Sequence, residues 1–273
     1  MLRLVKELEK FKINATDGEI GQVDDFYFED DTWAVRYFVV DTGTWLLSRK
    51  VLISPILVHE PDWRARTLPV SITKEQVKNS PNFDTDKPVS RQHEEQYSGY
   101  YGYPVYWGGL GLWGEGLYPA SMVPGFSGYG VDHVQREREL ATFRRRERDR
   151  HRNDDPHLRS CNAITGYHIH ATDGEIGHVS GFLVDDETWA IRYLIIDTSN
   201  WWIGHKVLIA PRWIKDVSWS ERMVFIDVTQ DAVQSAPAYD STTAWSRDKE
   251  QALYQHYRRS AYWAGSTEFD SEI

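Results

Sequence analysis

The pentapeptide DGEIG at residues 17–21 returns at residues 173–177, an offset of 156 positions. The same offset relates residues 11–107 to residues 167–263 without a gap, and 36 of these 97 aligned positions are identical. A repeat of this length indicates a duplicated domain, because the repeats of solenoid proteins span only about 20 to 50 residues. The duplication also supplies an internal comparison, since a residue that a site needs in one copy can be sought in the other.

Glycines mark the first turn and the first bend of each copy. Gly18 supplies the positive φ of a tight hairpin turn after a strand at residues 11–15, and Gly174 takes the same place in the second copy. Gly21 and Gly177 lie inside the following strand, where glycine indicates a bulge or a close approach of another backbone. Such a bend is what a small barrel requires.

The rest of each copy continues as short strands. In the first copy we expect strands at residues 19–29, 33–41, 46–53 and 66–72, and then a helix at Lys74–Lys78 capped by Thr73. Five curved strands are enough to close a small barrel. The predicted fold is mainly β: two tandem small barrels in a pseudo-twofold arrangement, with short helices after each barrel and a flexible linker. The predicted boundaries are 1–85 for the first barrel, 86–157 for the linker, 158–240 for the second barrel and 241–273 for a helical tail.

Composition limits the classes of function. The chain of 273 residues has a net charge of −10 and a single cysteine, Cys161, which excludes an intrachain disulfide. We expect no signal peptide and no membrane span, and therefore a cytoplasmic protein. Acidic barrels disfavour direct binding of nucleic acid, although residues 136–152 hold eight basic and four acidic side chains.

Four elements occur in the order of a known family: DGEIGQV at 17–23, TWAVRY at 32–37, VDTGTWL at 40–46 and VLISP at 51–55. They resemble the PRC-barrel superfamily, named after the cytoplasmic domain of the photosynthetic reaction-centre H subunit, which also includes a domain of a ribosome-maturation factor. More narrowly, the chain resembles two-barrel bacterial proteins related to the H subunit, although we expect it to lack the H subunit's N-terminal membrane helix. The resemblance implies a docking module that performs no side-chain chemistry.

Three motif positions carry the same side chains in both copies: Trp33, Arg36 and Asp41 in the first, and Trp189, Arg192 and Asp197 in the second. We interpret each arginine as buried and paired with the aspartate five positions later, with anion binding as the alternative. We interpret the tryptophans, together with Trp45 and Trp201, as packing residues, with a ligand-stacking platform as the alternative.

Acidic and histidine clusters are the remaining candidate sites. The acidic runs at 29–31 and 185–187 are predicted to be solvated hairpin turns, because they lack the pattern of a calcium loop. His168 and His170 share one face of a strand, and a three-residue turn would bring His178 opposite His168. A metal site there stays open as an alternative. We assign no catalytic, cofactor-binding or metal-binding residue.

The segments outside the barrels are aromatic or basic. Helices are predicted to begin at Ser90-Arg91 and Ser246-Arg247, and each leads into a cluster of tyrosine and tryptophan. These aromatic residues either recognise a protein or fold back on the barrels. Residues 108–130 are predicted to form a mobile linker and residues 134–152 an exposed helix.

These observations favour a non-enzymatic scaffold that needs no cofactor and docks a protein partner, which the sequence does not identify. The two copies are expected to form an intrachain pseudo-dimer, and association of whole chains into a homo-oligomer stays open. Two alternatives remain: an RNA or ribosome-assembly factor, and a sensor that binds a metal or small ligand through His168 and His170 or between the barrels.

Overall fold

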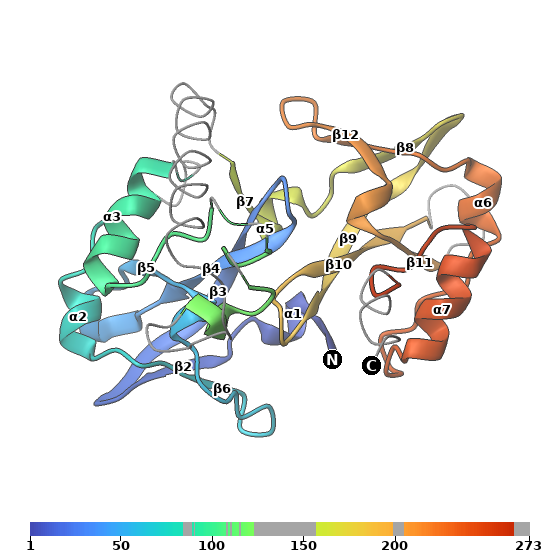
Figure 1. The fold of residues 1–273 in the computed structure, drawn as a ribbon. Helices are drawn as coiled ribbons and strands as arrows, with labels where there is room; N and C mark the ends of the chain where they lie inside the picture. Colours follow the sequence, from blue (N-terminus) through green and yellow to red (C-terminus); the bar gives the residue numbers. More distant parts are fainter. Residues whose placement is uncertain are drawn as a thin grey trace, which may run out of the picture. The chain divides into compact units, whose positions relative to one another are not determined.

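The computed structural model describes residues 1–83, 89, 91–107, 109, 111–114, 116–122, 157–198 and 205–264. The chain forms two compact units. The first contains Met1, Arg3–Ala163 and Val184–Ile191, and the second contains Leu2, Ile164–Leu183 and Arg192–Ile273. The fold is mainly β, with two sheets and short helices, as Figure 1 shows. The domain boundaries drawn from the sequence stay predictions.

The first sheet has the strand order β5-β4-β3-β2-β6, and β7 pairs with β3. Its strands are β2 (Lys12–Ala15), β3 (Gly18–Glu29), β4 (Ala34–Asp41), β5 (Lys50–Ile53), β6 (Thr67–Pro69) and β7 (Leu158–Ser160). β2 and β6 run parallel, and the other pairs are antiparallel. Every residue of β4 before Asp41 is buried, as expected of a strand covered on both faces.

Two of the predicted strands are shorter than expected. Residues 46–53 were predicted as one strand, but the chain forms a 3₁₀ turn, η1 (Gly43–Leu46), and only then enters β5. The prediction was wrong because Gly43, Leu47 and Ser48 all have left-handed backbone, which reverses the chain. β6 covers only three of the seven residues predicted at 66–72, and it ends at a proline, which has no N–H to donate.

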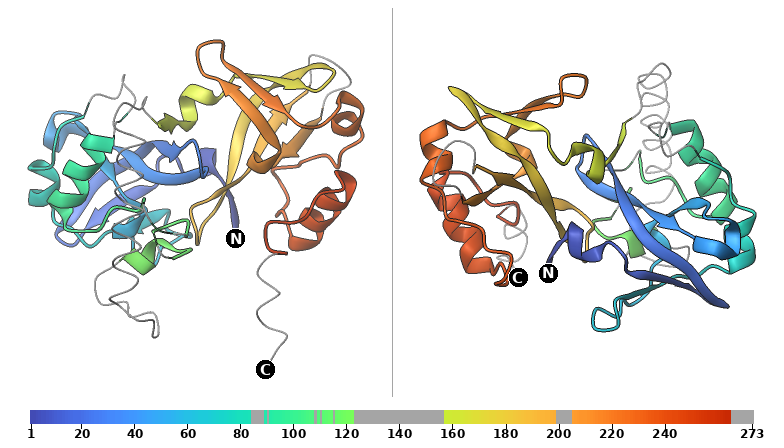
Figure 2. Two further views of the ribbon diagram at one scale, coloured as in Figure 1. Left: turned by 45° about the horizontal axis from the view of Figure 1, so that its top comes forward. Right: turned by 180° about the vertical axis from the view of Figure 1, so that it is seen from behind.

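The first unit also contains helices and further 3₁₀ turns. They are α1 (Val5–Leu8), η2 (Pro55–Leu57), α2 (Lys74–Lys78), α3 (Arg91–Tyr101) and η3 (Pro119–Met122). The predicted cap of α2 is confirmed, because the Thr73 hydroxyl accepts from the Gln76 N–H and the Gln76 side chain accepts from the Thr73 N–H. α3 lies beside the first sheet (Figures 1 and 2). Its Tyr97 joins a buried cluster with Tyr27, Tyr37, Val39, Leu52, Val89 and Leu158.

The second sheet has the order β11-β10-β9-β8-β13-β12, and β1 pairs with β9. Its strands are β1 (Leu2–Leu4), β8 (His168–Ala171), β9 (Gly174–Asp185), β10 (Ile191–Asp197), β11 (Lys206–Ile209), β12 (Ile214–Ser218) and β13 (Met223–Ile226). The short helices are α5 (Cys161–Ile164), η4 (Pro211–Trp213), α6 (Gln230–Gln234) and α7 (Arg247–His256). Thr229 and Ser246 cap α6 and α7, which confirms the helix start predicted at Ser246-Arg247.

The pairings of the described strands give open orders in both sheets, so the closed barrels expected from the sequence are not confirmed. Along the described ranges, no helix is long and apolar enough to cross a membrane.

The glycines predicted to lie against another backbone do so in both copies. A Cβ placed on Gly21 would lie 2.0 Å from the carbonyl oxygen of Asp41, and one on Gly177 would lie 2.1 Å from that of Asp197. Gly18 and Gly174 have φ of 140° and 150°, as their turns require. The duplicated glycines are therefore explained by contacts of the chain with itself.

Candidate functional site

Arg36 is the most deeply buried charged side chain of the sequence motif. It is the extra residue of a bulge in β4, since Tyr37 pairs with Tyr27 while Val35 pairs with Phe28. The side chain is 1% exposed, and its Nη2 donates to Glu29 Oε2 at 2.7 Å. Its Nη1 donates to the carbonyl oxygen of Leu112, also at 2.7 Å. The guanidinium is thus neutralised and hydrogen-bonded inside the first unit.

Two aromatic rings contact this guanidinium. Its carbon lies 3.8 Å from the ring centre of Tyr106 and 4.6 Å from that of Trp113. Trp113 is fully buried, and its indole N–H donates to the carbonyl oxygen of Thr188, a residue of the same unit, at 2.8 Å. The prediction that residues 108–130 form a mobile linker is therefore wrong around Trp113, while residues 123–130 lie outside the described residues.

The predicted partner of Arg36 was wrong. Asp41 accepts a hydrogen bond from the Gly43 N–H at 2.9 Å, and the ion pair is made with Glu29 instead. Glu29 lies on the neighbouring strand β3, where it pairs with Ala34 beside the Arg36 bulge, and this position brings its carboxylate to the guanidinium. Glu29 is only 4% exposed, so the predicted solvated turn at residues 29–31 was also wrong at its first residue.

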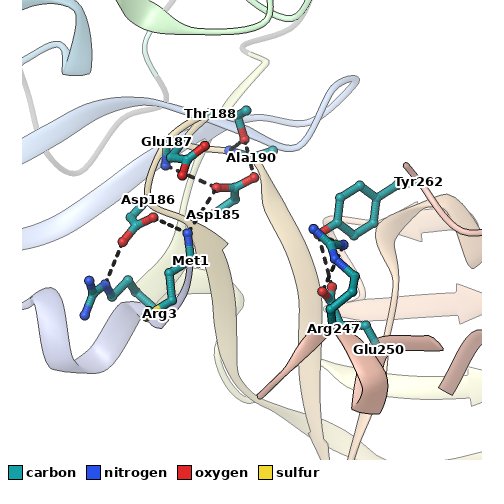
Figure 3. Close-up of polar contacts among 10 residues, drawn as sticks. All are labelled: Met1, Arg3, Asp185, Asp186, Glu187, Thr188, Ala190, Arg247, Glu250 and Tyr262. Carbon is teal, nitrogen blue, oxygen red and sulfur yellow. Dashed lines mark hydrogen bonds and ion pairs between the residues drawn. The ribbon is translucent and has the colours of Figure 1, made fainter. Parts of the chain in front are cut away.

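The second unit carries a related cluster around Glu250 of α7. Tyr193 and Tyr262 donate to Glu250 Oε1 at 2.9 and 3.1 Å. Arg247 forms an ion pair with Glu250 Oε2 at 3.0 Å, and Figure 3 shows Arg247, Glu250 and Tyr262. Arg192, which is half-buried, stacks on Tyr262 with 4.1 Å between its guanidinium carbon and the ring centre. Burial raises the pKa of the Glu250 carboxyl, and the hydrogen bond from Tyr193 partly opposes this.

Glu94 is the equivalent of Glu250 in the first copy. It is fully buried, and its carboxylate accepts from the Tyr106 hydroxyl at 2.7 Å and contacts His157 Nε2 at 2.7 Å. The sequence reasoning missed this pair of glutamates. The repeat itself could have identified the two glutamates. Glu94 aligns with Glu250 at the offset of 156, and Tyr106, which donates to Glu94, aligns with Tyr262, which donates to Glu250.

Trp33 and Trp189 belong to a paired turn inside the first unit. The Val35 N–H donates to the Trp189 carbonyl at 2.8 Å, and the Ile191 N–H donates to the Trp33 carbonyl at 2.7 Å. Ala34 and Ala190 form the β-bridge between these bonds. Residues that are equivalent in the two copies therefore pair with each other, which is a local twofold relation.

Both tryptophans are buried by this paired turn, at 7% and 3% exposure. Trp33 stacks on Phe28 with ring centres 4.9 Å apart, and Trp189 meets Phe38 edge-on at 4.7 Å. These contacts agree with packing and not with a stacking platform for a ligand. Trp45 donates its indole N–H to the Ile20 carbonyl, while Trp201 lies outside the described residues.

Ion pairs repeat the same twofold relation. Arg3 donates to Asp186 Oδ2 at 2.8 Å, and Arg159, its equivalent, donates to Asp30 Oδ2 at 2.8 Å. The Asp186 N–H donates to the carbonyl of Met1, and the Asp30 N–H to that of His157, both at 3.0 Å. All these residues belong to the first unit, and Figure 3 shows the contacts around Asp186.

A disulfide tests the paired turn directly. The bonds on either side of Ala34 and Ala190 define a pair that is not itself hydrogen-bonded, with Cα atoms expected about 4.5 Å apart. That separation lies within the range of disulfides. The variant Ala34→Cys/Ala190→Cys is expected to form an intrachain disulfide under mild oxidation, measured as faster migration on a non-reducing gel and as the linked peptides by mass spectrometry.

Each single cysteine variant serves as the control for this experiment. The native Cys161 is buried, and burial raises the pKa of its thiol, so it is a poor competitor for either new cysteine. Recovery of the double variant with both new thiols reduced would contradict the paired turn.

The histidine cluster is present only in part. His178 does pair with His168 across β8 and β9, because of a bulge after Ile169. His168 Nδ1 contacts Glu175 at 2.6 Å, and His170 Nδ1 contacts the carbonyl oxygen of Ala171 at 2.8 Å. Within the described part of the chain, no group of three or more His, Cys, Asp or Glu residues is arranged to hold a metal ion. The geometry gives the metal alternative no support.

The aromatic residues that follow the two predicted barrel regions are mostly buried. Buried members are Tyr97, Tyr103 and Tyr106 after the first barrel, and Tyr254 and Tyr257 after the second. The structure therefore favours aromatic clusters that fold back on their own unit over clusters exposed to recognise a protein. The helix predicted at residues 134–152 lies outside the described residues.

The fold and these clusters define a duplicated, β-rich module whose motif side chains hold strands, turns and helices together. Residues 5–77 match the family model of the PRC-barrel domain, so the resemblance to the PRC-barrel superfamily predicted from the sequence is confirmed for this part of the chain. A search of curated proteins gave no match.

Proposed function

We propose that the protein is a non-enzymatic scaffold or adaptor that docks a protein partner. It acts through two PRC-type barrels in a pseudo-twofold arrangement, in a role like that of the reaction-centre H subunit, and it works in the cytoplasm. The observation that supports this most is the burial of Arg36: the motif residue best suited to bind an anion is 1% exposed and bonded to Glu29 and Leu112.

The other duplicated motif residues support the same proposal. Gly21 and Gly177 lie against backbone, and Trp33 and Trp189 are packed. Residues used in this way stabilise the module, which leaves its surface for recognition. The net charge of −10 disfavours the RNA alternative, because an acidic surface repels phosphate.

Crosslinking in native cells tests the proposal. The tagged full-length chain is crosslinked, purified under denaturing conditions and analysed by mass spectrometry, and a tagged protein of similar charge serves as the control. The expected result is a small set of proteins linked to defined surface lysines, for example Lys6 or Lys12. Links no more specific than those of the control would argue against a docking role.

A further inference from the structure

Trp113 lies in a site that Arg36, Tyr106 and Thr188 form within the first unit, called here the tryptophan site. The Trp113 side chain is 0% exposed, and its indole N–H donates to the Thr188 carbonyl at 2.8 Å. The Trp113 ring centre lies 4.6 Å from the Arg36 guanidinium carbon, and the Tyr106 ring meets it edge-on at 6.2 Å. The site therefore contacts the ring of the tryptophan as well as its single polar group.

The main chain next to Trp113 is bound by the same site. Arg36 Nη1 donates to the Leu112 carbonyl at 2.7 Å, while Arg36 Nη2 is held by Glu29, also at 2.7 Å. A buried tryptophan is a common anchor at protein interfaces, and docking domains add main-chain hydrogen bonds beside such an anchor. The tryptophan site thus has both elements of peptide recognition.

The segment that carries Trp113 is bonded to itself. The Gly111 N–H donates to the Gly114 carbonyl at 2.7 Å, and the Trp113 N–H donates to the Gly116 carbonyl at 2.8 Å. These main-chain groups stay paired when the segment leaves the site, so its release does not require new partners for them. The segment can therefore leave the tryptophan site as a unit.

Comparison of the two copies separates the site from its occupant. In the second unit Arg192 stacks on Tyr262 at 4.1 Å, as Arg36 stacks on Tyr106 at 3.8 Å in the first. Trp113 lies beyond residues 11–107, the part of the chain that is repeated. The arginine–tyrosine contact belongs to the repeated module, whereas Trp113 is supplied from outside it.

We propose that the tryptophan site docks a tryptophan-bearing segment of a protein partner, and that residues 111–114 occupy it until the partner displaces them. The proposal rests on the docking function proposed above and names the surface that performs it.

The occupied site specifies the chemistry of the partner. Its segment presents a tryptophan whose N–H reaches Thr188, and one residue earlier a main-chain carbonyl that reaches Arg36. Glycine is favoured after the tryptophan, because Gly114 has φ of 64° and a Cβ there would lie 3.0 Å from Met122 Sδ. The expected partner therefore carries a Trp-Gly pair in an exposed loop.

Peptide binding to the full-length chain tests the proposal. Trp113→Ala removes the anchor of the present occupant, and a dye-labelled peptide with the sequence of residues 108–116 is titrated into this variant while fluorescence anisotropy is followed. We expect saturable binding. Binding to the unmodified chain is expected to be at least about tenfold weaker, because the attached segment competes at an effective concentration of about a millimolar. The same peptide with alanine in place of tryptophan is expected not to bind.

Two further variants complete the test. Trp113→Phe keeps a ring beside Arg36 but lacks the N–H that donates to Thr188, so it provides a folded variant even if Trp113→Ala unfolds. Because one hydrogen bond is lost, it is expected to bind the peptide about fivefold more tightly than the unmodified chain. Leu117→Ala is the control, since Leu117 is 59% exposed, and it should bind like the unmodified chain.

The proposal would be overturned if the peptide bound neither Trp113 variant, or bound Trp113→Ala and the unmodified chain equally. Self-association of the unmodified chain that Trp113→Ala abolishes would make a second copy the occupant, against a different partner protein. These measurements use no partner, so their failure leaves the docking function to be judged by the crosslinking experiment.

Discussion

Gly21→Ala is expected to lower the free energy of unfolding by at least about 3 kcal/mol. The new Cβ would lie 2.0 Å from the carbonyl oxygen and 2.8 Å from the carbonyl carbon of Asp41, and 2.9 Å from the Cα of Thr42. All three are backbone atoms, so no side chain can move aside to make room. The end of β4 must separate from β3, and this would break the ladder where Gln22 pairs with Asp41.

The measurement is equilibrium unfolding in urea, followed by circular dichroism and by tryptophan fluorescence. Gly99→Ala is the matched control, because Gly99 lies within α3 and a Cβ there meets no atom within 4 Å. Alanine favours a helix by about 1 kcal/mol over glycine, so this control should be neutral or more stable. Similar unfolding midpoints for the two variants would show that β3 and β4 do not approach closely at Gly21.

The duplicated glycines were predictable because a glycine inside a strand is itself a sign of a bulge or a close backbone approach. A glycine at the same place inside the same strand of both copies indicates that a side chain does not fit there. Gly21 and Gly177 both confirm this, at 2.0 and 2.1 Å from a backbone oxygen. The helix of Lys74–Lys78 was predicted for a similar reason, since the capping residue and its partner lie three positions apart in the sequence.

Contacts between distant segments were not predictable in this way. The partner of Arg36 was sought along its own strand, whereas the structure supplies Glu29 from the neighbouring strand and Leu112 from a segment beyond the repeat. Trp113 lies outside the aligned residues, so comparison of the copies gave no sign that it is buried. Long-range contacts depend on how strands pair and where a bulge falls, and neither follows from spacing alone.

Arg36→Met is expected to lower the free energy of unfolding by about 3 to 5 kcal/mol. Methionine keeps most of the apolar stem that packs against Tyr106 and Trp113, so the loss is chiefly electrostatic. The substitution removes the guanidinium from Glu29, whose carboxylate is 5% exposed. It also removes the donor to the buried carbonyl of Leu112.

A double-mutant cycle separates the ion pair from packing. Arg36→Met/Glu29→Leu is expected to be more stable than Arg36→Met alone, because it removes the carboxylate left without its guanidinium in the single variant. Lys12→Met is the control, because it breaks an exposed ion pair. The Lys12 and Glu19 side chains are 58% and 53% exposed, and Lys12 Nζ lies 2.9 Å from Glu19 Oε2. The expected loss in the free energy of unfolding is at most about 1 kcal/mol. If Arg36→Met lost no more stability than Lys12→Met, the Arg36 pair would not stabilise the first sheet. The structural role of Arg36, which is the main support for the proposed function, would then be contradicted.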